Sequence, residues 1–355
     1  MLHKAEQPES VSGPGNRAAI VLVTGASRSG TTMLSRILGN HSSILGLKEL
    51  HYFGDLCDPG RGDQQIGAGE LERLSASLLA RQARGIWGSG CTNADYAQAK
   101  SICASLEAPE RTGFGVFAAA LSFLSRQAGN SIACEQTPRN VFYAERILAA
   151  LPQVRVIHMV RDPRAVLASQ KNRWQLKRLG AKNVPFAEVS RTWLNYHPIT
   201  MAKLWAGATR SALRLADHPR AKLVRFEELA ANPEEVVREI CDFLGIAFES
   251  NMLLVPQWGS SNIQHQMEEK GISKDVVDRW EKILGDGEVS IVERYAGPLM
   301  KQFSYEARSA GGMPGKLSTG RYLLSYPFHL VGVALANPRR AWIQLSAMLQ
   351  SNPTG

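Results

Sequence analysis

Residues 18–32 read AAIVLVTGASRSGTT. The first seven residues form a continuous apolar run of strand length, which predicts a strand buried on both faces of a parallel sheet. A glycine follows directly, and the spacing of Met33, Leu34, Ile37 and Leu38 then predicts an amphipathic helix. A buried strand, a glycine-rich loop and a helix in this order are the arrangement that presents a helix N-terminus to a phosphate group.

The loop carries two glycines, Gly25 and Gly30, in the G-x-x-x-x-G spacing of a phosphate-binding loop. Such glycines let backbone N–H groups turn toward an anion. Thr31 stands where a nucleoside triphosphatase has the lysine that reaches the β- and γ-phosphates, which disfavours an ATPase or a GTPase. The residues expected to bind the anion are Arg28, Ser29, Gly30, Thr31 and Thr32.

Strand-length apolar runs and helical patterns alternate along the rest of the chain. Strands are expected at residues 44–47, 131–134, 154–160 and 222–226, and helices at residues 141–151 and 187–215. This alternation predicts an α/β fold of the P-loop type, with three layers and a central parallel sheet flanked by helices.

The domain organisation follows from the same patterns. One large domain is expected over residues 18–306, with a helical insertion at about residues 55–128 that shapes an acceptor pocket. Residues 1–17 are polar and predict a disordered leader. Because this segment lacks the apolar stretch of a signal peptide, a cytoplasmic location is expected. Residues 307–355 form a C-terminal extension.

The C-terminal extension contains an apolar stretch, residues 322–336, interrupted by Pro327. It is shorter than the ~20 residues of a membrane span. A pair of terminal helices docked on the domain is the favoured interpretation. The alternative is a helix that lies in a membrane interface, which would add peripheral contact with the inner face of a membrane.

A second anion-binding pattern occupies residues 154–169, VRVIHMVRDPRAVLAS. A strand ends at Arg161, Asp162 and Pro163 start a helix, and Ser169 follows two turns later. Arg161 and Ser169 can therefore face one anion beside the glycine loop, and Arg164 is expected to add positive potential. A strand-end arginine in a salt bridge is the plain alternative.

These two stretches resemble the nucleotide-binding motifs of sulfotransferases. Residues 24–32 look like the 5′-phosphosulfate loop, with Ser27 in place of the usual proline, and Arg161 and Ser169 match the pair that binds a 3′-phosphate. The resemblance implies the donor 3′-phosphoadenosine-5′-phosphosulfate (PAPS), the product adenosine 3′,5′-bisphosphate and no metal. Residues 135–140 and 223–229 extend it, although Gln136 stands where a lysine is common, which leaves the stabilisation of the transferring group open.

The resemblance also indicates a general base. Glu49 follows the second expected strand and matches the catalytic glutamate of tyrosylprotein and glycan sulfotransferases. His51 is the rival, because its ordinary pKa of ~6.5 suits proton transfer and cytosolic sulfotransferases use a histidine. Near the end of the domain, Ser260 or Ser261 is expected to touch the phosphosulfate.

Composition limits the function classes without choosing among them. The net charge of +9 and the pI of about 9.4 favour anionic partners such as nucleotides, acidic glycans, anionic lipid or nucleic acid. The five cysteines include no C-x-x-C pair, so they are expected to be reduced and structural, and no metal-ligand cluster is apparent.

Three functions are therefore weighed. The favoured one is sulfuryl transfer to a hydroxyl of a carbohydrate, glycolipid or lipo-oligosaccharide, with a small alcohol or phenol as the second acceptor class. A P-loop kinase would need the lysine that Thr31 replaces. A non-catalytic binding module, for example one that binds nucleic acid or membrane, would explain the charge but not two phosphate motifs at strand ends, and nucleic acid is not expected as a partner.

Overall fold

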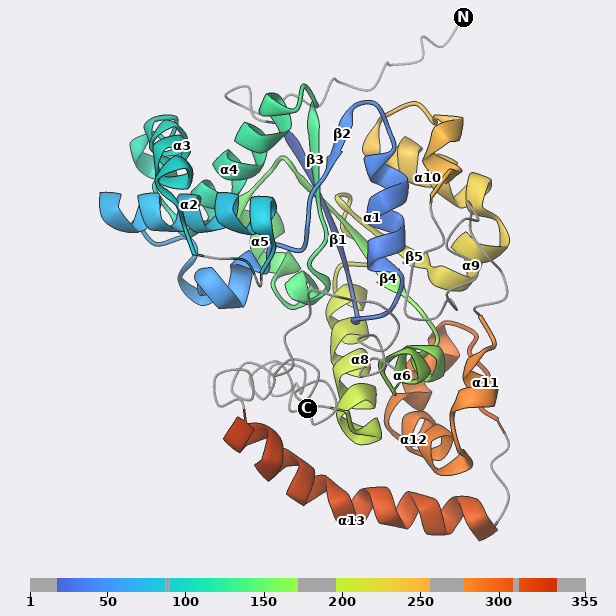
Figure 1. Ribbon diagram of the computed structural model, residues 1–355. Helices are drawn as coiled ribbons and strands as arrows, with labels where there is room; N and C mark the ends of the chain where they lie inside the picture. The colour runs from blue at the N-terminus through green and yellow to red at the C-terminus, as the bar shows by residue number, and fades with distance from the viewer. Residues whose placement is uncertain are drawn as a thin grey trace, which may run out of the picture.

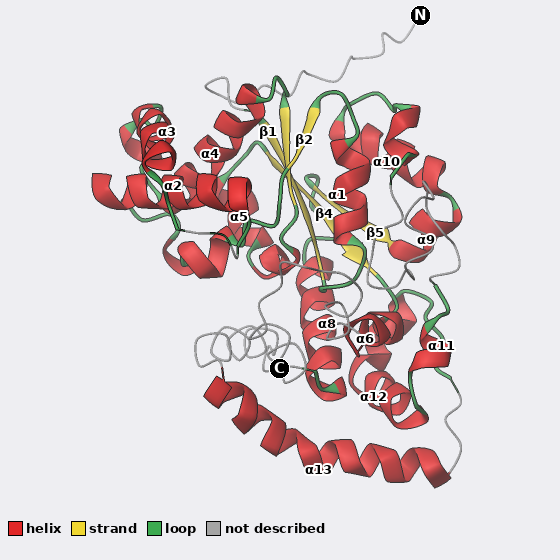
Figure 2. Ribbon diagram, in the orientation of Figure 1, coloured by secondary structure: helices red, strands yellow, loops and turns green. Residues whose placement is uncertain are grey.

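Five parallel strands form one sheet at the centre of this computed structural model (Figure 2), which describes residues 18–171 except Trp87 and Ser89, 196–255, 277–308 and 313–336. In sheet order the strands are β2 (Ile44–Gly46), β3 (Ile132–Glu135), β1 (Ala19–Gly25), β4 (Val154–Val160) and β5 (Ala221–Arg225). The predicted α/β class with a central parallel sheet is confirmed, and the observed strands lie within one residue of the expected ones.

Helices cover both faces of the sheet and its carboxyl edge (Figure 1). The α-helices of the described residues are α1 (Thr31–Gly39), α2 (Ala68–Arg84), α3 (Asn93–Ala104), α4 (Gly113–Gln127), α5 (Ala144–Ala150), α6 (Pro163–Lys171), α8 (Pro198–Leu213), α9 (Phe226–Ala231), α10 (Pro233–Leu244), α11 (Trp280–Ile283), α12 (Asp286–Gln302) and α13 (Met313–Ala336). Short helical turns lie at Tyr52–Leu56, Pro59–Arg61, Ala108–Glu110, Pro138–Phe142 and Ser250–Leu253. Helices α2, α3 and α4 fall within residues 55–128.

The alternation of side chains along β1 places one set on each face of the sheet. Ile20 and Leu22 pack with α2, α4 and α5, whereas Val21 and Val23 pack with α1 and α10. All four side chains are at most 2% exposed. Burial of an aliphatic side chain of this size contributes about 1.5–3 kcal/mol, so β1 helps to hold both helical layers to the sheet.

A third cluster of helices, α6, α8, α11 and α12, packs at the carboxyl ends of the strands. The fully buried Trp205 of α8 anchors it, because its indole Nε1 donates a hydrogen bond to the carbonyl oxygen of Arg161 at 2.8 Å. This contact fixes the end of β4 against α8. Helix α8 starts at Pro198, and the part of the expected helix at residues 187–195 lies outside the described residues.

In the C-terminal extension, Pro327 does not interrupt the secondary structure as expected. Helix α13 runs through this proline as one helix of 24 residues. A proline removes a single backbone hydrogen bond, and contacts with α8 and α12 stabilise the rest of α13. Residues 337–355, like residues 1–17, lie outside the described residues. Among the helices of the described part of the chain, none is both long and apolar enough to cross a membrane.

Candidate functional site

The loop between β1 and α1 is shaped by two glycines. Any other residue at either position would displace neighbouring atoms of the protein. A Cβ atom at Gly25 would lie 2.5 Å from the carbonyl oxygen of Met159, and one at Gly30 would lie 2.5 Å from the ring of Phe226. Gly30 also has a φ of 95°, which favours glycine. The loop can therefore lie directly against β4 and α9.

The start of α1 has the properties of an anion site. No side chain caps the helix, and its first turn contains no acidic residue. The hydroxyl of Ser29 is buried and has no hydrogen-bond partner among the described residues. A helix N-terminus carries partial positive charge, so this end of α1, with Ser29 and Thr31 beside it, suits the binding of a phosphate group.

Arg28 joins the glycine loop to the second predicted motif. Its Nε donates a hydrogen bond to the hydroxyl of Ser169 at 3.0 Å, and its carbonyl oxygen accepts one from Nη1 of Arg161 at 3.3 Å. Arg28 has a φ of 80°, which is uncommon for a residue with a side chain. The structure thus brings together three predicted site residues from two segments more than 130 positions apart.

Arg161 is a buried cation at the carboxyl end of β4. Its side chain is 6% exposed and stacks on the ring of Phe226, with 4.2 Å between the guanidinium carbon and the ring centroid. Burial lowers the pKa of Arg161 from its ordinary value, but a guanidinium remains charged at neutral pH. A buried positive charge of this kind interacts strongly with an anion, since little water screens it.

A chain of hydrogen bonds links the glycine loop to both candidate bases. The hydroxyl of Thr32 donates to Oε1 of Gln136 at 3.3 Å, and Nε2 of Gln136 donates to Oε1 of Glu49 at 3.3 Å. The other carboxylate oxygen of Glu49 lies 3.0 Å from Nε2 of His51. Glu49 and His51 are partly exposed, with side-chain exposures of 37% and 20%. The two rivals therefore form one pair.

Two residues to which the sequence analysis assigned no role hold this pair in place. The carboxylate of Glu135 is fully buried and accepts hydrogen bonds from the backbone N–H groups of Leu50 and Thr137, and burial raises its pKa. Arg81 of α2 donates to the carbonyl oxygens of Leu50 and His51 at 2.6 and 2.8 Å. The position of Glu135 directly before Gln136 in a motif could have indicated its role, whereas no motif includes Arg81.

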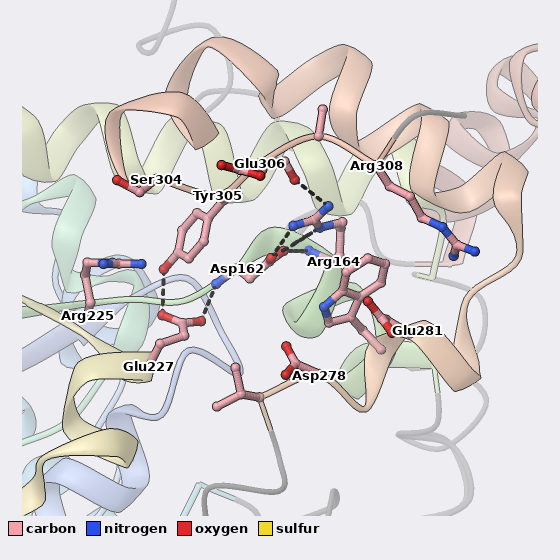
Figure 3. A pocket seen from close by; sticks show the side chains of 13 residues that line it. Asp162, Arg164, Arg225, Glu227, Asp278, Glu281, Ser304, Tyr305, Glu306 and Arg308 are labelled. Carbon is pink, nitrogen blue, oxygen red and sulfur yellow. Dashed lines mark hydrogen bonds and ion pairs between the residues drawn. The ribbon is translucent and has the colours of Figure 1, made fainter. Parts of the chain in front are cut away.

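The expectation that Arg164 adds positive potential was wrong. Arg164 is buried and forms two parallel hydrogen bonds with Asp162, 3.0 Å from Nε and 2.7 Å from Nη2 (Figure 3). A third hydrogen bond, of 3.0 Å, joins its Nη1 to Glu293. Its charge is neutralised inside the protein, because Asp162 lies two residues earlier at the start of the helix and places its carboxylate at ion-pair distance.

A cavity of about 420 Å³ is lined in part by this ion pair (Figure 3). Its charged lining comprises Asp162, Glu227, Asp278, Glu281 and Glu306 together with Arg164, Arg225 and Arg308. Acidic residues outnumber basic ones there, so this cavity is a poorer place for a nucleotide phosphate than the region around Arg28 and Arg161.

Comparison with known proteins identifies the family. The model of the Sulfotransferase family matches residues 21–250, which include the glycine loop, the pair Glu49–His51 and the motif of Arg161 and Ser169. The chain belongs to the sulfotransferase family. The family expected from residues 24–32 and 154–169 is thereby confirmed.

Relatives of this sulfotransferase include carbohydrate sulfotransferases and a nodulation protein. Human carbohydrate sulfotransferase 3 is 29% identical over 180 residues, which are 46% of this chain and 36% of that protein. The chain thus spans about a third of this relative. Nodulation protein NoeE of Sinorhizobium fredii is 26% identical over 327 residues, 85% of this chain and 71% of that protein. The sulfotransferase domain from the curacin biosynthetic pathway, at 22% identity, superimposes with a TM-score of 0.49 over 82% of this chain and 99% of that domain.

The remaining predicted site residues of this sulfotransferase are Ser260 and Ser261, which lie outside the described residues. Within the described residues, no group of three or more His, Cys, Asp or Glu side chains is arranged to hold a metal ion.

Proposed function

We propose that this sulfotransferase transfers the sulfuryl group of PAPS to a hydroxyl group of a carbohydrate. The observation that carries the proposal is the double contact of Arg28, which binds Ser169 through its side chain and Arg161 through its carbonyl oxygen. The 5′- and 3′-phosphates of PAPS are attached to one ribose, so their binding sites must adjoin. The Arg28 contacts make the two motifs adjoin.

The chain's own residues divide the work of the reaction. Arg28 and the start of α1, with Ser29, Gly30, Thr31 and Thr32, bind the 5′-phosphosulfate, and Arg161 with Ser169 binds the 3′-phosphate. Glu49 accepts the proton of the acceptor hydroxyl. The oxygen of that hydroxyl forms a bond to sulfur as the bond from sulfur to the 5′-phosphate oxygen breaks. Positively charged groups around the loop stabilise the negative charge that passes to that phosphate. The products are a sulfate ester and adenosine 3′,5′-bisphosphate.

The acceptor class rests on relatives rather than on geometry. Several relatives are named carbohydrate sulfotransferases, among them the human protein and a mouse protein that is 33% identical over 103 residues. A carbohydrate hydroxyl, free or on a glycolipid, is therefore the acceptor proposed here. An assay with sugar and phenol acceptors separates the two classes, and turnover of phenols alone would contradict the carbohydrate proposal.

Titration calorimetry with adenosine 3′,5′-bisphosphate, ATP and AMP tests the donor site. The bisphosphate should bind most tightly, because only it presents a phosphate to Arg161. Arg161→Ala should weaken bisphosphate binding by roughly tenfold to a hundredfold, the value of a lost hydrogen bond to a charged group, and should leave AMP binding nearly unchanged.

Arg155→Ala is the matched control, since Arg155 lies on the same strand at its amino end and donates to the carbonyl oxygen of Leu244. It should keep wild-type affinity for all three nucleotides. Preference for ATP with magnesium would indicate a kinase, and the absence of nucleotide binding would indicate a binding module.

A further inference from the structure

Helix α13 is attached to the domain through one of its faces. The hydroxyl of Ser325 lies 3.2 Å from Nε2 of His197, and Nε2 of His329 lies 3.2 Å from the hydroxyl of Thr200 on α8. The ring of Tyr326 packs against His197, with 5.1 Å between the ring centroids. These contacts determine which face of α13 points away from the protein.

The opposite face carries large apolar side chains that remain exposed among the described residues. We call these five residues the apolar stripe: Leu317, Leu324, Phe328, Val331 and Leu335, which are 82, 76, 80, 60 and 80% exposed. Successive members are seven, four, three and four residues apart, which places them on one side of a helix. A continuous row of exposed apolar side chains of this kind marks an interaction surface.

The charge of the surrounding sequence indicates the chemistry of the partner. Residues 307–355 contain no Asp or Glu, and their basic residues are Arg308, Lys316, Arg321, Arg339 and Arg340. Arg321 is exposed and lies four residues after Leu317 and seven before Phe328, so it stands on the same side of α13 as the apolar stripe. An apolar row beside positive charge complements the interface of an anionic lipid bilayer.

We propose that α13 lies in the plane of an anionic membrane interface, with the apolar stripe inserted and the docked face carrying the domain. Helix α13 is found on the side of the molecule to which the carboxyl ends of the strands point (Figure 1). Bound in this way, the protein presents the edge of the sheet that holds the candidate site toward the membrane. The proposal does not depend on the proposed sulfuryl transfer.

Co-sedimentation of the full chain with lipid vesicles tests the proposal. Wild-type protein should bind vesicles of phosphatidylglycerol and not those of phosphatidylcholine. The double variant Leu324→Gln/Phe328→Gln should lower the partition coefficient by roughly tenfold or more, because two large side chains no longer enter the apolar region. Arg321→Gln should lower the partition coefficient on the phosphatidylglycerol vesicles by roughly fivefold.

Leu254→Gln is the matched control, since Leu254 is 57% exposed, apolar and outside α13. It should bind vesicles as wild type does, and all variants should keep wild-type nucleotide binding, which shows that they fold. Wild-type protein that fails to bind anionic vesicles would overturn the proposal. So would a dimer that the double variant dissociates without any change in vesicle binding, because the apolar stripe would then contact a second copy.

Discussion

The carboxylate of Glu49 is held by both of its oxygens. Gln136 donates to Oε1, and His51 contacts Oε2. Such double attachment fixes the orientation of a general base, which is required for proton transfer to occur within hydrogen-bond reach of the acceptor. The amide of Gln136 is neutral, whereas a lysine at this position would carry a positive charge next to Glu49.

Single substitutions in the Glu49–His51 pair should have unequal effects. Glu49→Ala should lower kcat by roughly a hundredfold to ten-thousandfold, the usual contribution of a general base, and leave the affinity for adenosine 3′,5′-bisphosphate unchanged. His51→Gln should lower kcat far less, because its amide can still hydrogen-bond Glu49. Steady-state kinetics with calorimetry on the same preparations measure both quantities. An active Glu49→Ala variant together with an inactive His51→Gln variant would instead make His51 the base.

At the scale of single residues, the sequence indicated the kinds of side chain more readily than their contacts. Arg28 and Arg161 stood out because each follows a predicted strand in a motif. The hydrogen bond from Arg28 to Ser169 could not be predicted, since it joins positions 141 apart and depends on which strands are neighbours. Arg81 lies in a helical pattern without any motif, so its contacts with the backbone at Leu50 and His51 appeared only in the fold.

At the scale of elements, the order of the strands arranges the candidate site. In sheet order, β2 is followed by Glu49, β3 by Gln136, β1 by the glycine loop and β4 by Arg161. Because all strands are parallel, these residues lie along one edge, with the loop between the candidate base and the predicted 3′-phosphate site. Runs of apolar residues predicted the strands. The order of the strands in the sheet depends on how strands and helices pack together, which the sequence of one strand does not reveal.

The contact between β1 and β4 should make folding sensitive to acid. Nδ1 of His158 lies 3.2 Å from the hydroxyl of Thr24, and burial lowers the pKa of His158 to about 3. The folded protein therefore keeps His158 neutral, while the unfolded chain binds a proton below its ordinary pKa of ~6.5. The stability from this group is complete above pH ~6.5 and is lost progressively, by about 1.4 kcal/mol per pH unit, as the pH falls toward 3.

Urea denaturation of the wild type and of His158→Gln at about pH 7 and about pH 5 measures this effect. The wild type should lose about 2 kcal/mol more of its unfolding free energy between these conditions than the variant does. An equal loss in both proteins would mean that His158 does not remain neutral in the folded state.

At the scale of the whole molecule, Arg164 connects parts of the chain that the sheet does not hold. It pairs with Asp162 at the start of α6 and with Glu293 of α12, and it donates to the carbonyl oxygen of Glu306 at 2.8 Å. Its guanidinium also lies 4.2 Å from the ring centroid of Trp280 on α11. The motif at residues 154–169 drew attention to Arg164 and contains its partner Asp162, but Glu293 and Glu306 lie 129 and 142 residues later. The full set of partners therefore could not be predicted from the sequence.

Arg164→Met should therefore destabilise the whole domain rather than alter its nucleotide preference. The side chains of Arg164 and Asp162 are 7% and 9% exposed, and removal of one partner from a buried ion pair leaves an uncompensated charge, at a cost of about 3–5 kcal/mol. Arg73→Met is the matched control, because Arg73 and its partner Glu70 are each 51% exposed, and such surface pairs contribute about 0–1 kcal/mol. Chemical denaturation compares the two variants with the wild type. If Arg164→Met kept wild-type stability but lost affinity for adenosine 3′,5′-bisphosphate, Arg164 would belong to the nucleotide site, and the ion pair with Asp162 would not be what holds α6, α11 and α12 together.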